Sequence, residues 1–165
     1  MEDFSHLDRN GSVRMVDVTE KQSSFRHAAA RSVIRMKPET FHRIIHQQID
    51  KGNVLETARI AGIMAAKKTA ELIPMCHPLN LTHVRIDFHP DDKRTAIAIR
   101  VDVRLNGPTG VEMEALTAAT VAALTIYDMC KAIDREMRIS DIVLLEKAGG
   151  KSGHFLRPED PDLLD

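Results

Sequence analysis

Aromatic residues are scarce in this chain. They make up 4% of its 165 residues, with one tyrosine and no tryptophan. Proteins that hold single-stranded nucleic acid stack its bases on aromatic side chains, so this composition does not favour such a protein. Lys and Arg number 23 against 24 Asp and Glu, for a formal net charge of −1. Without excess positive charge the chain has no general attraction for DNA or an acidic membrane. We therefore expect no nucleic-acid and no membrane partner, and an anionic ligand would need a local cluster of cations.

Cysteine is equally scarce and long apolar runs are absent. The two cysteines, Cys76 and Cys130, fit a reducing compartment better than a disulfide framework. The first residues contain no apolar stretch of the kind that marks a secretory signal. Residues 115–127 carry no charge, but these 13 residues are too few for a membrane helix, which needs about 20. We expect a cytoplasmic protein.

The length suits a single domain with a core that needs neither disulfide nor metal. Residues 1–24 are polar and show no sustained hydrophobic period, so we expect a flexible N-terminal arm. Residues 156–165 are acidic and contain two prolines, a composition typical of a disordered tail. The folded domain should therefore comprise residues 25–155.

Hydrophobic periodicity within this domain predicts the order strand, helix, helix, strand, strand, helix, strand. Two segments alternate apolar and polar residues, and residues 90–93 between them are typical of a hairpin turn. This order predicts an α+β, ferredoxin-like fold, an antiparallel sheet with helices packed on one face. The predicted strands are residues 28–36, 84–88, 97–105 and 137–145. One predicted helix begins at Pro38, and two others span residues 54–72 and 109–131.

The second predicted helix and the loop after it have distinct compositions. Small residues on the helix permit close approach to another element. Pro74 and Pro78 exclude regular helix from residues 73–79, so we expect a constrained loop there. The small residues are Ala58, Gly62, Ala65 and Ala66.

The helix predicted over residues 109–131 is apolar in its middle and charged at both ends. Asp128 and Lys131 near its end lie one turn apart on one face. They are either a helix-stabilising pair or an acid–base pair in a pocket, and the local pattern leaves both readings open. Glu112 and Glu114 near its start flank Met113, so we expect at most one of them to face a given pocket.

Two further segments contain residue types that bind ligands. Residues 150–152 read Gly-Lys-Ser, but a P-loop needs a glycine where Leu145 stands. The alternatives are a flexible cationic loop that contacts phosphate and a plain solvated linker. Cys76 and His77 are adjacent, yet no further ligands follow at the spacing of zinc sites. This loop is therefore either a binding wall or a structural turn.

These segments together resemble one family, the cyclic pyranopterin monophosphate synthases of the molybdenum cofactor biosynthesis protein C type. The resemblance covers about residues 15 to 155. One departure is Asn53, where the family usually has Asp, and both residue types cap helices well. The motifs that carry the resemblance are residues 15–18, 51–52, 57–62, 65–67, 72–79, 109–117, 123–132 and 149–153.

The resemblance implies an activity for the folded domain. Such a lyase converts 3′,8-cyclised dihydro-GTP into cyclic pyranopterin monophosphate with release of pyrophosphate, an early step of molybdenum cofactor biosynthesis. It requires no cofactor, and any magnesium would accompany the triphosphate. The resemblance further implies a homohexamer, a trimer of dimers, with its site at a subunit interface. The alternative is a non-catalytic, oligomeric nucleotide-binding protein of the same fold, in which Asp128 and Lys131 only pair with each other.

The resemblance also assigns residues to roles, none of them as metal ligand. Glu112 and Asp128 are 16 positions apart, roughly 24 Å along a helix, which also favours a site shared between subunits. The catalytic residues would be Asp128, Lys51 and Lys131. Substrate-binding residues would be Met75, Cys76, His77, Glu112, Met113, Glu114 and Lys67. Weaker candidates for contacts with the triphosphate are Lys21, Arg26, Lys147 and Lys151.

Overall fold

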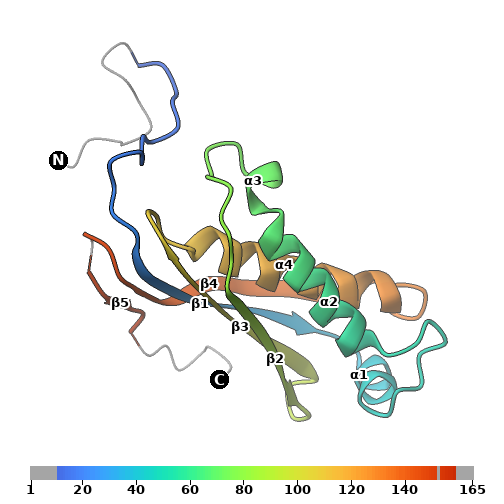
Figure 1. The fold of residues 1–165 in the computed structure, drawn as a ribbon. Helices are drawn as coiled ribbons and strands as arrows, with labels where there is room; N and C mark the ends of the chain where they lie inside the picture. Colours follow the sequence, from blue (N-terminus) through green and yellow to red (C-terminus); the bar gives the residue numbers. More distant parts are fainter. Residues whose placement is uncertain (1–10, 152, 159–165) are drawn as a thin grey trace.

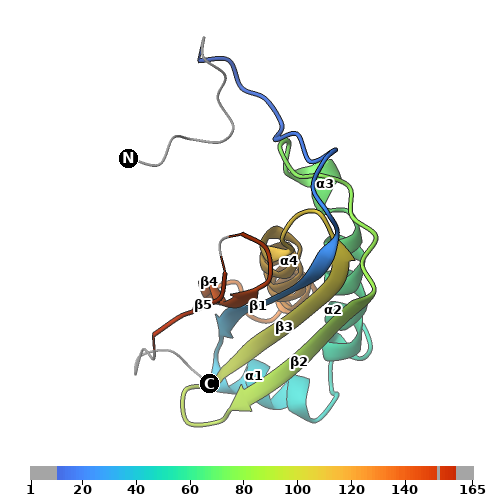
Figure 2. The same ribbon diagram turned by 60° about the vertical axis from the view of Figure 1, so that its left-hand side comes forward.

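The computed structural model describes residues 11–151 and 153–158 (Figure 1). Five antiparallel strands form one sheet in the order β2-β3-β1-β4-β5. Helices α2 and α4 lie on the same face of this sheet (Figures 1 and 2). The predicted α+β, ferredoxin-like fold is thus confirmed. The elements are β1 (Ser24–Arg35), α1 (Pro38–Ile45), α2 (Val54–Lys67), α3 (Thr69–Leu72), β2 (His83–Asp91), β3 (Ala96–Gly107), α4 (Glu112–Cys130), β4 (Arg138–Ala148) and β5 (Phe155–Leu156).

The core lies between the sheet and these two helices. Ile97, Ile99 and Val101 of β3 are fully buried beneath α4. The residues of α4 that face them are mainly alanines spaced three and four apart, which let the helix lie close to the sheet. These alanines are Ala115, Ala118, Ala119, Ala122 and Ala123.

Gly62 sets the distance between α2 and α4. A methyl group at this position would lie 3.0 Å from the Ala118 carbonyl oxygen and 3.4 Å from the Ala122 methyl carbon. It would also lie against the end of the Ile86 side chain on β2. The close approach predicted for the small residues of this helix is therefore confirmed, with α4 as the partner.

The second predicted helix is not continuous, which corrects the prediction over residues 54–72. Helix α2 ends at Lys67, and Lys68 has φ −113° and ψ 13° before the short α3 begins. The Thr69 hydroxyl donates to the carbonyls of Ala65 and Ala66 at 3.3 and 3.1 Å. Side-chain hydrogen bonds of this kind compete with the helical backbone pattern and favour a break.

The predicted hairpin turn at residues 90–93 is also displaced. Strand β2 continues through Pro90 and Asp91, which pair with Ile97 and Ala96. Strand β2 is the edge of the sheet, and an edge strand tolerates a proline because one side of its backbone needs no partner. The chain turns after Asp91 instead.

The second face of the sheet combines charged side chains with a small buried apolar cluster of Val33, Ala96 and Ala98, and no described helix packs against it (Figure 2). Asp102 on β3 accepts hydrogen bonds from His27 on β1 at 3.0 Å and from Arg100 at 3.2 Å. Arg35 pairs with Asp141 on β4 at 3.1 Å. Long side chains paired in this way cover a face that has no helix above it.

The described part of the chain extends slightly beyond the domain that we expected. Leu156 pairs with Glu146 in β5, a strand that the sequence did not predict. Arg157 follows it and hydrogen-bonds from its backbone to Leu145 and from its side chain to Leu144, at 2.7 and 2.8 Å. Most of the predicted N-terminal arm and acidic tail, residues 1–10 and 159–165, lies outside the described residues. Within the described ranges no helix has the length and hydropathy to cross a bilayer.

Candidate active site

Three of the predicted site residues meet at the end of α4. Lys131 donates from its ammonium to a carboxylate oxygen of Asp128 at 2.6 Å, and Lys51 donates to the backbone carbonyl of Asp128 at 3.0 Å. The hydrogen bond and charge of Lys131, with the charge of Lys51, hold the pKa of Asp128 below its usual value. The same pairing raises the pKa of Lys131. This cluster, Lys51–Asp128–Lys131, is solvent-exposed.

The loop before α2 holds Lys51 in this cluster. Gly52 has φ +98°, a conformation that favours glycine. Asn53 then caps α2, since its side-chain oxygen accepts from the Glu56 amide at 3.1 Å. The Asn that departs from the usual family residue thus performs the capping role that we expected of it.

A cavity of about 350 Å³ lies at the opposite end of α4. We call it the acidic cavity because Glu112 and Glu114 form part of its wall. Its other walls come from residues 16–21 and from the constrained loop after α3. Of the predicted substrate-binding residues, it is lined by Met75, Cys76, His77, Glu112, Met113 and Glu114.

Both glutamates at the start of α4 line the acidic cavity, so the prediction that only one would face a given pocket is wrong. The two residues point in different directions from the first turn of the helix, yet both line the cavity. Glu114 is 4% exposed. Its burial, with the negative charge of Glu112 nearby, raises its pKa to about 7. At neutral pH this carboxyl can therefore both hold and release a proton.

Cys76 and His77 present different chemistry to the same cavity. Burial and the neighbouring Glu114 raise the pKa of the Cys76 thiol, which opposes a thiolate nucleophile. The His77 ring contacts the N-terminal segment, with Nε2 at 2.7 Å from the Val16 carbonyl oxygen. A carbonyl only accepts, so Nε2 carries the hydrogen and the neutral ring keeps Nδ1 as an acceptor.

A second cavity of about 320 Å³ adjoins the acidic one. The two share Lys21, Thr109, Gly110 and Glu112 as lining residues. All four of the weaker predicted phosphate contacts line this second cavity, which we call the cationic cavity. In the sequence these four residues lie in separate segments, and the fold brings them together. They are Lys21, Arg26, Lys147 and Lys151.

Hydrogen bonds to the backbone hold the Arg26 side chain in place in the cationic cavity. Its guanidinium donates to the carbonyls of Gly107 and Pro108, both at 3.1 Å. Gly149 and Gly150 have φ of +96° and +78° and pack so closely that a methyl group would overlap the Phe25 carbonyl or the Arg26 guanidinium. The Gly-Lys-Ser segment therefore forms a tight turn against Arg26, and Lys151 of this turn reaches the cavity wall.

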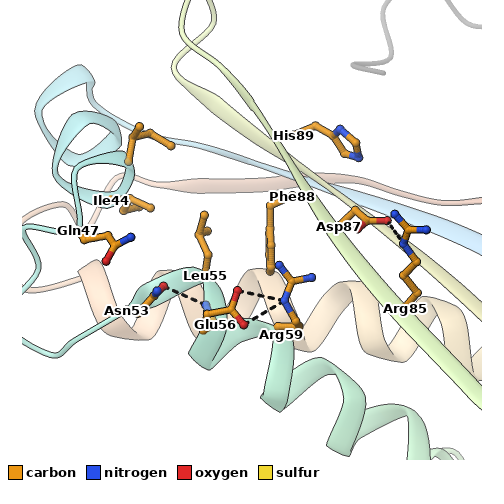
Figure 3. A pocket seen from close by; sticks show the side chains of 11 residues that line it. Ile44, Gln47, Asn53, Leu55, Glu56, Arg59, Arg85, Asp87, Phe88 and His89 are labelled. Carbon is orange, nitrogen blue, oxygen red and sulfur yellow. Dashed lines mark hydrogen bonds and ion pairs between the residues drawn. The ribbon is translucent and has the colours of Figure 1, made fainter.

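Lys67 lines neither of these cavities; it is exposed at the last residue of α2. A third cavity, about 440 Å³, lies elsewhere, between the start of α2 and β2 (Figure 3). Its charged groups neutralise one another, with Glu56 against Arg59 at 3.2 Å and Arg85 against Asp87 at 2.7 Å. This cavity therefore has no excess charge to attract an ionic substrate.

Several lining residues were missed by sequence reasoning. Val16, Val18 and Leu79 supply apolar wall to the acidic cavity. His27 also lines the cationic cavity. This is unexpected, because its neighbour Arg26 lines the same cavity and strand alternation places the two side chains on opposite faces of the sheet. No sequence signal marks His27. Across residues 11–151 and 153–158, no group of three His, Cys, Asp or Glu is placed to hold a metal ion.

The two groups of site residues lie at opposite ends of α4 (Figure 1). Glu112 begins the helix and Asp128 lies in its last turn, roughly 24 Å apart at 1.5 Å per residue. A single chain therefore does not bring the Lys51–Asp128–Lys131 cluster to the paired cavities.

Comparison with known proteins identifies relatives along nearly the whole chain. Cyclic pyranopterin monophosphate synthase from Desulforapulum autotrophicum is 63% identical over 94% of this chain and 96% of that protein. The protein of the same name from Desulfatibacillum aliphaticivorans is 61% identical over 94% and 98%. That from Magnetococcus marinus is 57% identical over 95% and 96%. The pattern of the MoaC family matches residues 15–150, and the chain therefore belongs to the MoaC family.

Proposed function

We propose that this chain is a lyase that converts 3′,8-cyclised dihydro-GTP into cyclic pyranopterin monophosphate and releases pyrophosphate, an early step of molybdenum cofactor biosynthesis. The observation that carries the proposal is the pair of adjoining cavities at the start of α4. One is lined by proton carriers and apolar groups, and the other by four cations. A fused ring system with a triphosphate needs such a pair of environments side by side.

The cationic cavity suits the phosphate chemistry. In the proposed reaction a sugar hydroxyl attacks the α-phosphorus, and the bond from that phosphorus to the oxygen bridging the β-phosphate breaks. The leaving pyrophosphate takes the electron pair. Preorganised cations stabilise the charge that develops on it, and Lys21, Arg26, Lys147 and Lys151, which line one cavity, are the cations proposed for this role. No resident metal takes part in this proposal, and magnesium enters only with the triphosphate.

The acidic cavity and the Lys51–Asp128–Lys131 cluster suit the proton transfers. Opening and reclosing the purine-derived rings requires groups that give and take protons. Glu114 and His77 stand in the cavity wall with the remaining predicted contacts Met75, Cys76, Glu112 and Met113. Asp128, Lys51 and Lys131 are the proposed catalytic residues, and Lys67 is a further proposed substrate contact.

The separation along α4 supports a site to which two chains contribute. In the proposal, the cluster of one subunit closes the cavities of another, and the assembly is a homohexamer built as a trimer of dimers in the cytoplasm. The surface beside the cluster supports such a contact, since Leu124, one turn before Asp128 on α4, is 51% exposed. An exposed leucine next to charged catalytic groups is protected from water once a second copy packs against it.

The experiment is an assay for pyrophosphate and pterin product with cyclised dihydro-GTP, comparing the wild type with Asp128→Asn. The substitution removes the carboxylate charge and keeps its shape. We expect turnover to fall about 10²-fold or more, as for loss of an acid–base group, with an unchanged melting temperature and retained substrate binding.

The matched control is Glu136→Gln. It disrupts a similar exposed ion pair outside α4, in which Glu136 lies 3.0 Å from the Lys37 ammonium. It should leave turnover at the wild-type level. Full activity of Asp128→Asn would remove Asp128 from the mechanism. Binding without any turnover by the wild type would favour the alternative, a non-catalytic nucleotide-binding protein.

A further inference from the structure

Glu112 lines both of the adjoining cavities and therefore belongs to both halves of the proposed site. One of its carboxylate oxygens lies 3.8 Å from the Lys147 ammonium, and the two side chains are 31% and 15% exposed. Lys147 lines the cationic cavity. The start of α4 thus carries an acidic group that is paired with one of the cations proposed to bind phosphate.

Gly110 keeps the Glu112 carboxylate at the boundary between the cavities. A methyl group at residue 110 would overlap this carboxylate, so the Gly110 backbone lies directly against it. Gly110 itself lines both cavities. Of the two charged neighbours of Glu112, Lys147 lines the cationic cavity and Glu114 lines the acidic one. The Glu112 carboxylate therefore has one interaction partner in each cavity.

The charge of Glu112 acts differently on these two partners. Burial raises the pKa of Glu114 to about 7, and the negative charge of Glu112 adds to this rise. Towards the cationic cavity, Glu112 attracts the Lys147 ammonium, which partly neutralises it. A bound polyphosphate would attract the same ammonium with several negative charges. The two anions would then compete for one cation.

Other titratable groups surround Glu114 and the start of α4. The acidic cavity is also lined by Lys21, Cys76 and His77. The strands β1 and β4 contribute Arg26 and Lys147 to the cationic cavity. The buried residues of β3, α2 and α3, which also pack against α4, are uncharged. Lys21 and Glu112 are the charged residues common to both cavities, and Glu112 is the one that pairs with a further cation of the phosphate site.

We propose that Glu112 is a positioning residue that links the two cavities, because it holds Lys147 while the cationic cavity is empty and loses it to a bound polyphosphate. The charge of Glu112 then acts on Glu114 without compensation. Glu114 consequently takes up a proton from solvent more readily, and returns it when the anion leaves. Phosphate binding thereby prepares an acid for the ring chemistry in the neighbouring cavity. The inference deepens the proposed function and rests on its assignment of the cationic cavity to the triphosphate.

The first test is calorimetric titration of the full chain with inorganic tripolyphosphate. Glu112→Gln removes the competing charge, so affinity should rise about two- to fivefold, the scale of a partly exposed ion pair. Lys147→Met should bind more weakly. Adding Glu112→Gln to Lys147→Met should give a smaller rise, because no ammonium remains to be released. The difference between the two rises isolates the exchange of partners.

Proton uptake on binding is a readout that a purely structural role of Glu112 would not change. Titrations in two buffers of different ionisation enthalpy give the number of protons taken up. The difference between the wild type and Glu114→Gln gives the share of Glu114, since protonation of the ligand itself is common to both. We expect a positive share near pH 7 that shrinks in the Glu112→Gln background. Wild-type affinity should therefore fall more steeply above pH 7 than that of Glu114→Gln.

Glu71→Gln is the matched control for the ion pair. Glu71 also lies 3.8 Å from a lysine ammonium, that of Lys68, and lines neither cavity. This variant should bind tripolyphosphate as the wild type does. Glu112→Asp keeps the charge but shortens its reach to Lys147, so it should show part of the gain and provides the comparison if Glu112→Gln does not fold.

Equal gains from Glu112→Gln with and without Lys147 would overturn the inference, because Glu112 would then only repel the anion. So would wild-type protein that does not bind tripolyphosphate, or a Glu114 share of proton uptake that is unchanged in Glu112→Gln. These titrations need no turnover. Linked binding in a protein that releases no pyrophosphate would support this inference and reject the proposed function, whereas pyrophosphate release with equal gains would do the reverse.

Discussion

Glu114 combines deep burial with an acidic side chain, and this combination has a thermodynamic cost. A carboxyl that loses solvent favours its neutral form, which is why the pKa of Glu114 rises from an ordinary value of 4.5 to about 7. A glutamate is almost never buried unless it is paired, and a strongly shifted pKa in a cavity is typical of a functional site. The position of Glu114 in the acidic cavity supplies that function in our proposal.

Glu114→Gln should therefore stabilise the fold at alkaline pH and have little effect in acid. Between pH 4.5 and 7 the folded chain keeps a proton on Glu114 that the unfolded chain has released. The free energy of unfolding consequently falls as pH rises through this window, and stays lower above pH 7. Gln removes that loss, so we expect a gain of about 1–3 kcal/mol at pH 8 and almost none at pH 4.5.

Urea unfolding at the two pH values measures this difference. Glu71→Gln provides the control, because Glu71 is an exposed carboxylate on α3. It should change stability by a similar small amount at both pH values. An equal effect of Glu114→Gln at pH 4.5 and pH 8 would contradict the raised pKa of Glu114.

Packing of α2 on α4 illustrates how one residue decides the distance between two elements. Gly62 lies in the middle of α2, where its helix propensity alone favours replacement by alanine by about 1 kcal/mol. The neighbouring Ala118 carbonyl belongs to the backbone of α4 and cannot rotate aside. The tertiary contact therefore opposes the local preference.

We expect the contact to prevail, so that Gly62→Ala destabilises the protein by about 1–2 kcal/mol through overpacking. The sign is the discriminating result, because propensity alone predicts a gain. Thermal and urea unfolding of Gly62→Ala, with Gly62→Val as a more severe variant, measure it. A stabilised Gly62→Ala protein would show that α2 and α4 separate without cost.

At the scale of elements, periodicity predicted most of the fold, because alternation and helical spacing directly reflect burial on one side. The break at Lys68 and the displaced hairpin turn were not predictable in this way. They depend on the Thr69 hydroxyl and on Pro90 lying in an edge strand.

The site residues also divide into those that the sequence indicated and those that depend on the fold. Motifs indicated the residues at both ends of α4, whereas His27 reaches its cavity only through the course of β1 past the Gly149–Gly150 turn, and no local pattern encodes that.

For the molecule as a whole, the length of α4 is the decisive dimension. It separates the Lys51–Asp128–Lys131 cluster from the acidic and cationic cavities, so in our proposal the two groups meet only between chains. Closed symmetric assemblies can resolve this, since a two-fold contact places the same two surfaces together twice. Each dimer would then contain two equivalent sites, each with the end of one α4 and the start of another.

A mixing experiment tests this arrangement directly. Asp128→Asn and His77→Ala damage opposite ends of α4, and each should be inactive alone. If the site is shared, random co-assembly yields mixed dimers in which one of two sites combines wild-type Asp128 with wild-type His77, so activity returns to about a quarter of the wild-type level. Mixing Asp128→Asn with Lys51→Ala is the matched control. Both substitutions affect the same cluster, and every chain in this mixture carries one of them, so no wild-type cluster forms and no activity should return. A site contained within one chain gives no recovery in either mixture, and that result would reject the shared site while leaving the chemistry of the cavities in place.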